Sequence, residues 1–212
     1  MKAVITGDLV HSTQYDREQL SAVLNMLKKE FSHLEHARFR MFRGDSFQGV
    51  VDRIELALLY ALRIRTAIAR MEFGDSKIRT DARIAIGLGT IDFTRDSILE
   101  SNGVAFRHSG AALDEMKDSA QRMSLRATTS AITEEFKVSL ALLDGLMSKW
   151  GIASHEVVYY LTKDYKEQQI AEIIGISQAA VNARKKVVQW DAIKLLLQRY
   201  ATVTQNMRTD DR

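Results

Sequence analysis

Two Gly-Asp steps carry the side chains of this sequence that are best suited to chemistry. Gly7-Asp8 ends a short apolar run near the amino terminus, and Gly44-Asp45 lies between two further apolar runs. If these runs form neighbouring strands, the carboxylates meet at one edge of a sheet, where such a pair binds Mg²⁺ and leaves positions for nucleotide phosphates and water. We therefore expect Asp8, Asp45 and the backbone carbonyl of Leu9 as metal ligands. The alternative is ordinary turn chemistry, in which each Asp bonds to its own backbone.

The segment from Glu167 to Arg184 carries a second informative pattern. Ala171 is small where two helices would cross, Gly175 suits a turn, and Ser177 can cap the next helix. An apolar mini-core is expected from Ile170, Ile174, Ile176 and Val181. The pattern resembles helix-turn-helix domains of the sigma-factor region-four type, and this resemblance implies DNA binding. The residues that it places at the DNA are Ser177, Gln178, Asn182, Arg184, Lys185 and Lys186.

The helix-turn-helix interpretation has an alternative, a helical hairpin used only for packing or dimerisation. The formal net charge of the whole chain is only +3. After Ser130 there are 11 Lys and Arg against 10 Asp and Glu, and up to Ser130 there are 19 against 17. Any basic face for DNA must therefore be local.

The segments that must position the carboxylates alternate between strand-like and helix-like patterns. Apolar residues alternate in the strand-like segments and recur at spacings of three and four in the helical ones. The expected strands are Lys2 to Leu9, two within Arg38 to Asp52, Arg79 to Phe93 and Arg122 to Thr129; the expected helices are Tyr15 to Leu34, Ile54 to Met71 and Val104 to Lys117. This order predicts helices packed on one sheet.

Two details of these segments bear on packing. The helix from Ile54 is apolar over a wide arc, so we expect it to be buried, with Arg53, Arg63, Arg65 and Arg70 on its margin. In the strand around Ile84, the glycines Gly87 and Gly89 share one face. Glycines in this arrangement let another element come close to the backbone.

Residues after 130 show helical patterns alone. A long amphipathic helix is expected from Ile132 to Trp150, followed by a short one from His155 to Leu161. We therefore divide the chain into residues 1–130, an α/β domain, and residues 131–212, an all-helical domain whose helix-turn-helix covers about residues 154–199.

Composition limits the class of protein. Hydrophobic residues make up 46% and charged residues 27% of the 212 residues, as in a globular protein. No apolar run approaches the ~20 residues that cross a bilayer, and the amino terminus lacks a signal-peptide pattern. There is no cysteine, which is consistent with a reducing compartment. We expect a cytoplasmic protein without a membrane partner.

The first 130 residues resemble class III nucleotidyl cyclase domains. The segment from Ile5 to Thr13, which reads Ile-Thr-Gly-Asp-Leu-Val-His-Ser-Thr, is similar to their Asp-Ile-x-x-Ser/Thr metal-binding start. Gly44-Asp45 resembles their second metal aspartate at a hairpin tip, and residues 84–89 and 102–107 resemble a later strand and the opening of the helix that follows it. The resemblance implies a palm-like, ferredoxin-type α+β sheet with packed helices. It also implies nucleotide and phosphate contacts from Ser12, Thr13, Arg43, Gly44 and Arg107.

The sequence departs from the cyclase pattern at the phosphate-steadying residues. Those cyclases have an Asn and, four residues later, an Arg, where this chain has Arg107 and Ala111. Loss of such donors costs orders of magnitude in rate, and Arg43 and Arg107 can equally be surface arginines. The whole layout, with its appended helical domain, is closer to the SatD family of bacterial proteins, a resemblance that bears on the fold.

Three functions follow as hypotheses. The first is a bacterial regulator, expected to be a homodimer, whose palm-like domain binds a nucleotide with Mg²⁺ and biases DNA binding by the helix-turn-helix. The second is an enzyme, a divalent-metal-dependent nucleotidyl cyclase or nucleotidyl transferase. The third is a palm that serves only as a non-catalytic dimer scaffold.

Overall fold

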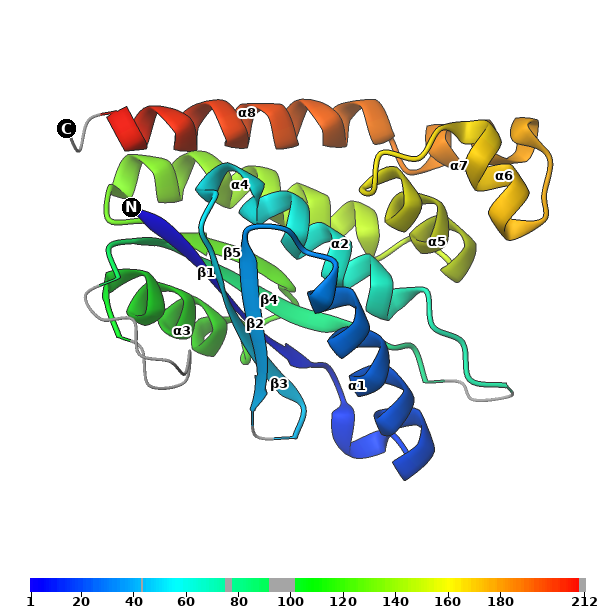
Figure 1. Ribbon diagram of the computed structural model, residues 1–212, viewed down its shortest axis with the longest axis horizontal. Coiled ribbons are helices and arrows are strands. Elements are labelled where there is room, and N and C mark those ends of the chain that lie inside the picture. The colour runs from blue at the N-terminus through cyan, green and yellow to red at the C-terminus, as the bar shows by residue number, and fades with distance from the viewer. Residues whose placement is uncertain (43, 75–77, 92–101, 210–212) are drawn as a thin grey trace.

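A five-stranded mixed sheet in the order β2-β3-β1-β4-β5 forms the centre of the computed structural model (Figure 1). The structure describes residues 1–42, 44–74, 78–91 and 102–209. The strands are β1 (Lys2–Leu9), β2 (Ala37–Phe42), β3 (Ser46–Val51), β4 (Ala82–Gly89) and β5 (Met123–Arg126). β1 pairs antiparallel with β3 and β4, and β5 joins β4 in parallel. The expected strands are confirmed, with shorter bounds for β4 and β5.

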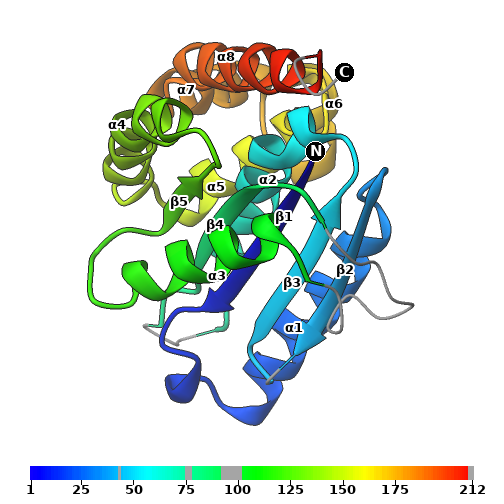
Figure 2. The same ribbon diagram turned by 90° about the vertical axis from the view of Figure 1, so that its left-hand side faces the viewer.

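Helices cover both faces of this sheet (Figure 2). Their bounds are α1 (Arg17–Ser32), α2 (Ala57–Ala69), α3 (Val104–Met116), α4 (Ser130–Met147), α5 (Ile152–Leu161), α6 (Glu167–Ile174), α7 (Gln178–Val187) and α8 (Trp190–Thr209), with short 3-10 turns η1 (Ser12–Gln14) and η2 (Ile54–Leu56). Of the described helices, α3 packs on one face, and α1, α2 and α4 lie on the other. This arrangement is the palm-like, ferredoxin-type fold that the sequence predicts.

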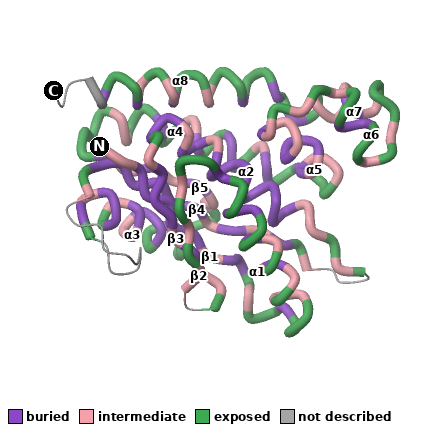
Figure 3. Tube along the Cα trace, viewed as in Figure 1, coloured by how far each residue is buried: buried purple, intermediate pink, exposed green. Residues whose placement is uncertain are grey.

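Coverage on both faces explains the composition of β1. Its residues Ala3 to Ile5 are fully buried because the strand lies in the middle of the sheet between two helical layers. A strand in this position has little contact with water on either face, so the residues of both faces are apolar from Ala3 to Ile5. Figure 3 shows the buried residues gathered along the sheet and the sides of the helices that face it.

α3 lies close to the sheet because β4 has glycines beneath it. A Cβ atom placed on Gly87 would lie 2.1 Å from the carbonyl oxygen of Ala105 and 2.4 Å from the backbone nitrogen of Ser109. The expectation that the glycine face admits another element is confirmed. The approach also lets the Ser109 hydroxyl bond to that of Thr6 in β1, at 2.8 Å.

Two arginines expected on the margin of α2 are instead buried. Arg63 is 8% and Arg65 is 2% exposed. Each is accommodated because a buried carboxylate compensates its charge. Arg63 forms an ion pair with Glu30 of α1, whose other oxygen accepts a hydrogen bond of 2.7 Å from Tyr159 of α5.

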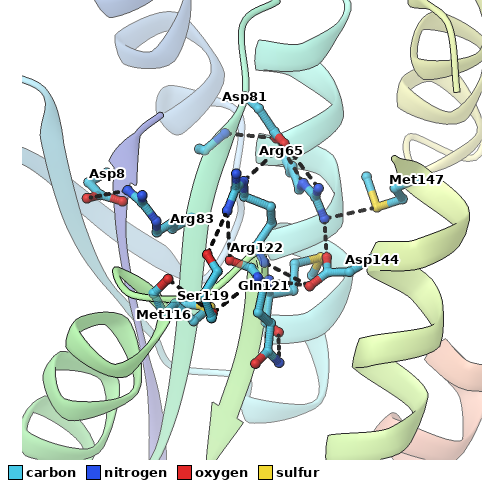
Figure 4. A network of polar contacts seen from close by, with 12 residues as sticks. Asp8, Arg65, Asp81, Arg83, Met116, Ser119, Gln121, Arg122, Asp144 and Met147 are labelled. Carbon is cyan, nitrogen blue, oxygen red and sulfur yellow. Dashed lines mark hydrogen bonds and ion pairs between the residues drawn. The ribbon is translucent and has the colours of Figure 1, made fainter. Parts of the chain in front are cut away.

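Arg65 is the centre of a second network, which Figure 4 shows. Its guanidinium bonds both oxygens of Asp81, at 2.9 and 3.1 Å, and also contacts Asp144 of α4. The second Asp144 oxygen accepts hydrogen bonds from the backbone nitrogens of Arg122 and Met123, at 2.8 and 3.0 Å. The network thereby ties α2, β4, β5 and α4 together.

The hydrophobic core is continuous across residue 130. The largest cluster contains Ile5 and Ile86 of the sheet together with Phe136 of α4 and Tyr200 of α8. The Tyr200 hydroxyl also donates to the carbonyl oxygen of Ile54, at 3.0 Å. A division into two domains at residue 130 stays a prediction; α4, α5 and α8 share the core of the palm-like part, whereas the buried residues of α6 and α7 form a separate cluster with Val157.

Candidate functional site

Asp8 and Asp45 lie at the same end of the sheet. In the register of β1 and β3, Asp8 is opposite Ser46, the residue after Asp45. The Leu9 backbone nitrogen donates to the Asp45 carbonyl oxygen at 3.1 Å, which closes the ladder at this point. The two Gly-Asp steps are therefore brought together, as the sequence predicts for neighbouring strands.

The Asp45 carboxylate is held by hydroxyl groups. The Ser12 hydroxyl donates to one oxygen at 2.5 Å, and the Ser46 hydroxyl lies 3.2 Å from the other. Ser12 begins the short η1 turn after β1, so this bond links the two segments that carry the carboxylates. Such bonds fix the direction in which a carboxylate presents its lone pairs.

Within the described part of the chain, one side chain is paired with the Asp8 carboxylate. One oxygen lies 3.4 Å from a guanidinium nitrogen of Arg83, which faces Asp8 across the β1–β4 register (Figure 4). The other oxygen is buried and has no hydrogen-bond partner among the residues that the structure describes. Burial raises the pKa of the Asp8 carboxyl above its ordinary value; Arg83 opposes this rise, and the nearby Asp45 carboxylate adds to it.

This pair fits Mg²⁺. The ion commonly binds one or two carboxylates and takes its remaining ligands from water and substrate phosphates. A buried carboxylate oxygen without a partner, beside a second carboxylate, is a suitable start for such a site. Within the described part of the chain, no group of three or more His, Cys, Asp and Glu side chains gathers to form an all-protein metal cage.

The other residues expected at the phosphates are placed differently. Thr13 is exposed in the η1 turn, and Gly44 adopts a φ of 80° in the β2–β3 turn. Arg43 lies outside the described residues. Arg107 is exposed near the start of α3, above Gly87, whereas Asp8 lies level with the end of α3. Within one chain, the structure therefore does not bring Arg107 to the carboxylate pair.

Arg83 is the site residue that sequence reasoning missed. It precedes the buried Ile84 in β4, where it looks like an ordinary outward-facing residue. Only the antiparallel register of β1 and β4 places it opposite Asp8. The alternation of large and small residues from Ile84 to Gly89 gives the face on which the Arg83 side chain lies but does not identify its partner strand.

The second expected site is formed by α6, a short turn and α7. Gly175 ends α6 with a φ of 70°, and the Ser177 hydroxyl accepts a hydrogen bond of 3.1 Å from the Ala180 nitrogen at the start of α7. The expected turn and cap are confirmed. The expected mini-core is present and is extended by Val157 of α5: Ile170, Ala171 and Val181 are buried, and Ile174 and Ile176 pack against them.

Two of the expected DNA-facing side chains have partners within the protein. Glu167 of α6 accepts a hydrogen bond from Lys185 at 2.9 Å and lies 3.3 Å from the Asn182 amide nitrogen. These bonds hold the pKa of Glu167 below its ordinary value. Gln178 and Lys186 are exposed, and Arg184 is half-buried. Of the residues expected to contact DNA, Asn182 and Lys185 hold α7 against α6, whereas Gln178 and Lys186 are exposed to solvent.

Comparison with solved structures finds likenesses to nucleotidyl cyclase domains over the amino-terminal part. The GGEEF domain of a diguanylate cyclase from Vibrio cholerae is 17% identical, with a TM-score of 0.42 over 60% of this chain and 83% of that one. A bacterial light-regulated adenylyl cyclase is 10% identical, with a TM-score of 0.41 over 58% of this chain and 74% of the other. At these values, the fold assignment rests on the strand order and register.

Neither a protein-family model nor a curated protein matches the sequence. The resemblance to the SatD family therefore stays a prediction. None of the described helices is both long enough and apolar enough to span a membrane.

Proposed function

We propose that the palm-like part is a divalent-metal-dependent nucleotide site, of nucleotidyl cyclase or nucleotidyl transferase type. The observation that carries the proposal is the convergence of Asp8 and Asp45, with one buried Asp8 oxygen that lacks a partner. When bound, Mg²⁺ supplies charge stabilisation at the phosphates and activates an attacking oxygen.

Each residue of the site has a separate part in this proposal. Asp8 and Asp45 hold the metal, and Ser12 and Ser46 orient Asp45 through their hydroxyl groups. Arg83 compensates part of the Asp8 charge while no cation is bound. Since Arg107 lies at the other end of α3, it does not steady the reacting phosphates within one chain, so we expect slow turnover.

The test is incubation of the purified protein with each nucleoside triphosphate and Mg²⁺ or Mn²⁺, followed by chromatography of the products. We expect a cyclic or transferred nucleotide product that Asp8→Asn abolishes. A nucleotide that raises the melting temperature without any product would limit the function to binding. No product and no thermal shift with any nucleotide would overturn the proposal.

A second candidate function, regulated DNA binding, is favoured by the capped α6–α7 pair with Gln178 and Lys186 exposed on α7. We propose that this pair is a helix-turn-helix and that the protein binds DNA as a homodimer. The palm-like part then acts as a nucleotide sensor that biases DNA affinity.

The DNA proposal is tested with Arg184→Ala/Lys186→Ala, because Lys185 is needed by Glu167. We expect weaker binding to all DNA sequences and a salt slope lower by about two. Lys28→Ala/Lys29→Ala removes two exposed charges from α1 and serves as the control. Equal DNA binding by the two variants, or a monomer in sedimentation with and without DNA, would contradict the proposal.

A further inference from the structure

A cavity of about 440 Å³ lies where the palm-like part meets α4 and α5. Its size falls in the range of about 300–1,000 Å³ typical of small-molecule sites. The apolar wall includes Ala69, Met71, Phe73, Ile78, Met147 and Ile152. These residues come from the end of α2, the segment before β4, and the ends of α4 and α5 that adjoin each other. The cavity is therefore on the sheet face opposite α3, whereas Asp8 points to the α3 face.

Two residues that line this cavity each have a ring nitrogen without a hydrogen-bond partner among the described residues. Trp150 is 3% and His155 is 8% exposed, and both side chains line the cavity. These atoms are the indole Nε1 of Trp150 and the Nδ1 of His155, and both are buried. The two rings pack edge to face, with 5.3 Å between their centroids. Buried polar groups in folded proteins are nearly always bonded to protein or to ordered water, so two such nitrogens on residues that line one cavity point to a bound molecule there.

The charges around the cavity compensate one another. Arg65 is committed to Asp81 and Asp144, while Glu72 and Arg79 are exposed and of opposite sign. Burial lowers the pKa of His155 to about 4; Asp81 opposes this change, and Arg65 and Arg79 add to it. The imidazole is therefore neutral at pH 7. The charged side chains around the cavity balance one another, so the cavity does not favour an ionic ligand.

We propose that this cavity binds a neutral nitrogen heterocycle of the nucleobase or nucleoside class. The indole N–H is a donor only, so the ligand must present an acceptor to it, and neutral His155 complements a neighbouring donor or acceptor. Such adjacent polar positions occur on the pairing edge of a nucleobase. The apolar and sulfur-containing wall accommodates the faces of a planar ring. Because the wall includes both the palm-like part and α4–α5, the ligand stabilises the contact between them.

The test is titration of the full-length protein with adenosine, guanosine, cytidine and uridine in the absence of divalent cations. We expect a saturable change in tryptophan fluorescence and a higher melting temperature for at least one nucleoside. Trp150→Phe keeps an aromatic ring but removes the donor, and it should weaken the affinity at least tenfold. Trp190→Phe removes the other tryptophan and should retain both the affinity and the fluorescence change.

Ile152→Trp provides a second variant, because Ile152 is 37% exposed and a larger side chain there fills the cavity without entering the core. It should abolish nucleoside binding while the circular dichroism stays unchanged. Asp8→Asn should bind nucleosides normally, which separates this site from the proposed metal site. Absence of saturable binding by every nucleoside, or wild-type affinity in Trp150→Phe and Ile152→Trp, would overturn the inference and leave a cavity that holds water only.

Discussion

At the scale of single residues, Asp8 is suited to bind a metal ion but lowers the stability of the metal-free protein. Its side chain is partly buried near Asp45, and among the described residues it is paired with Arg83 at 3.4 Å. A group whose pKa is raised in the folded state binds more protons there than in the unfolded chain, so the free energy of unfolding falls as pH rises through that window. At neutral pH, the ionised Asp8 therefore destabilises the metal-free protein.

Replacing Asp8 by Asn should separate stability from metal binding. We expect Asp8→Asn to raise the melting temperature of the metal-free protein at pH 7, with the gain vanishing as pH falls below the ordinary Asp value of 3.8. Mn²⁺ at a hundred times its dissociation constant adds ~2.7 kcal/mol of stability to the wild type, and at ~2–4 °C per kcal/mol this raises its melting temperature. The variant should show no such rise. Calorimetry with and without Mn²⁺ measures both effects, and an equal metal response in the two proteins would exclude Asp8 as a ligand.

Ser12 should affect metal affinity through Asp45. Ser12→Ala removes the 2.5 Å hydrogen bond that orients this carboxylate, and loss of such a bond typically costs about 10–100-fold in metal affinity. Thr13→Ala, in the same exposed turn, is the control. Isothermal titration with Mn²⁺ compares them, and equal dissociation constants would mean that Ser12 does not position a ligand.

At the scale of elements, the distance between α3 and the sheet is set by a missing side chain. Gly87 lies under the backbone of α3 at Ala105 and Ser109. A side chain on Gly87 would overlap these backbone atoms, and a change of side-chain rotamer would not relieve the overlap. The same approach makes the Thr6–Ser109 bond possible and thus fixes the position of α3.

Gly87→Ala should destabilise the protein by about 1–3 kcal/mol or more, because its methyl group overlaps backbone atoms. Gly110→Ala within α3 is the matched control. A Cβ there meets nothing within 4 Å, and alanine should stabilise the helix by about 0.5–1 kcal/mol. Urea unfolding of both variants checks the signs, and the prediction fails if Gly87→Ala unfolds at the wild-type midpoint.

At the scale of the whole molecule, buried ion pairs join the carboxy-terminal helices to the palm-like part. Glu30, Arg63 and Tyr159 link α1, α2 and α5, and Arg65, Asp81 and Asp144 link α2, the start of β4 and α4. Together with the shared hydrophobic core, these contacts predict that the chain unfolds as one unit.

Asp144→Ala should cost about 3–5 kcal/mol, because it leaves one side of the buried Arg65 charge and two backbone nitrogens without their partner. Glu134→Ala, which breaks an exposed pair on the same helix, should change stability by less than about 0.5 kcal/mol. Chemical unfolding followed by tryptophan fluorescence and circular dichroism measures both variants. Separate transitions in the wild type would contradict the single-unit interpretation.

The sequence by itself determined the order of strands and helices, the two Gly-Asp steps at strand ends, and the turn and cap at Gly175 and Ser177. These features are local, because hydrophobic periodicity and turn chemistry act over a few residues. The tertiary structure decided what depends on register and packing between distant segments. Arg83 meets Asp8 across 75 positions, Arg65 meets Asp144 across 79, and Arg107 lies at the far end of α3 from the carboxylates. No local pattern encodes these partners, since each follows from how strands align and which faces of the helices meet the sheet.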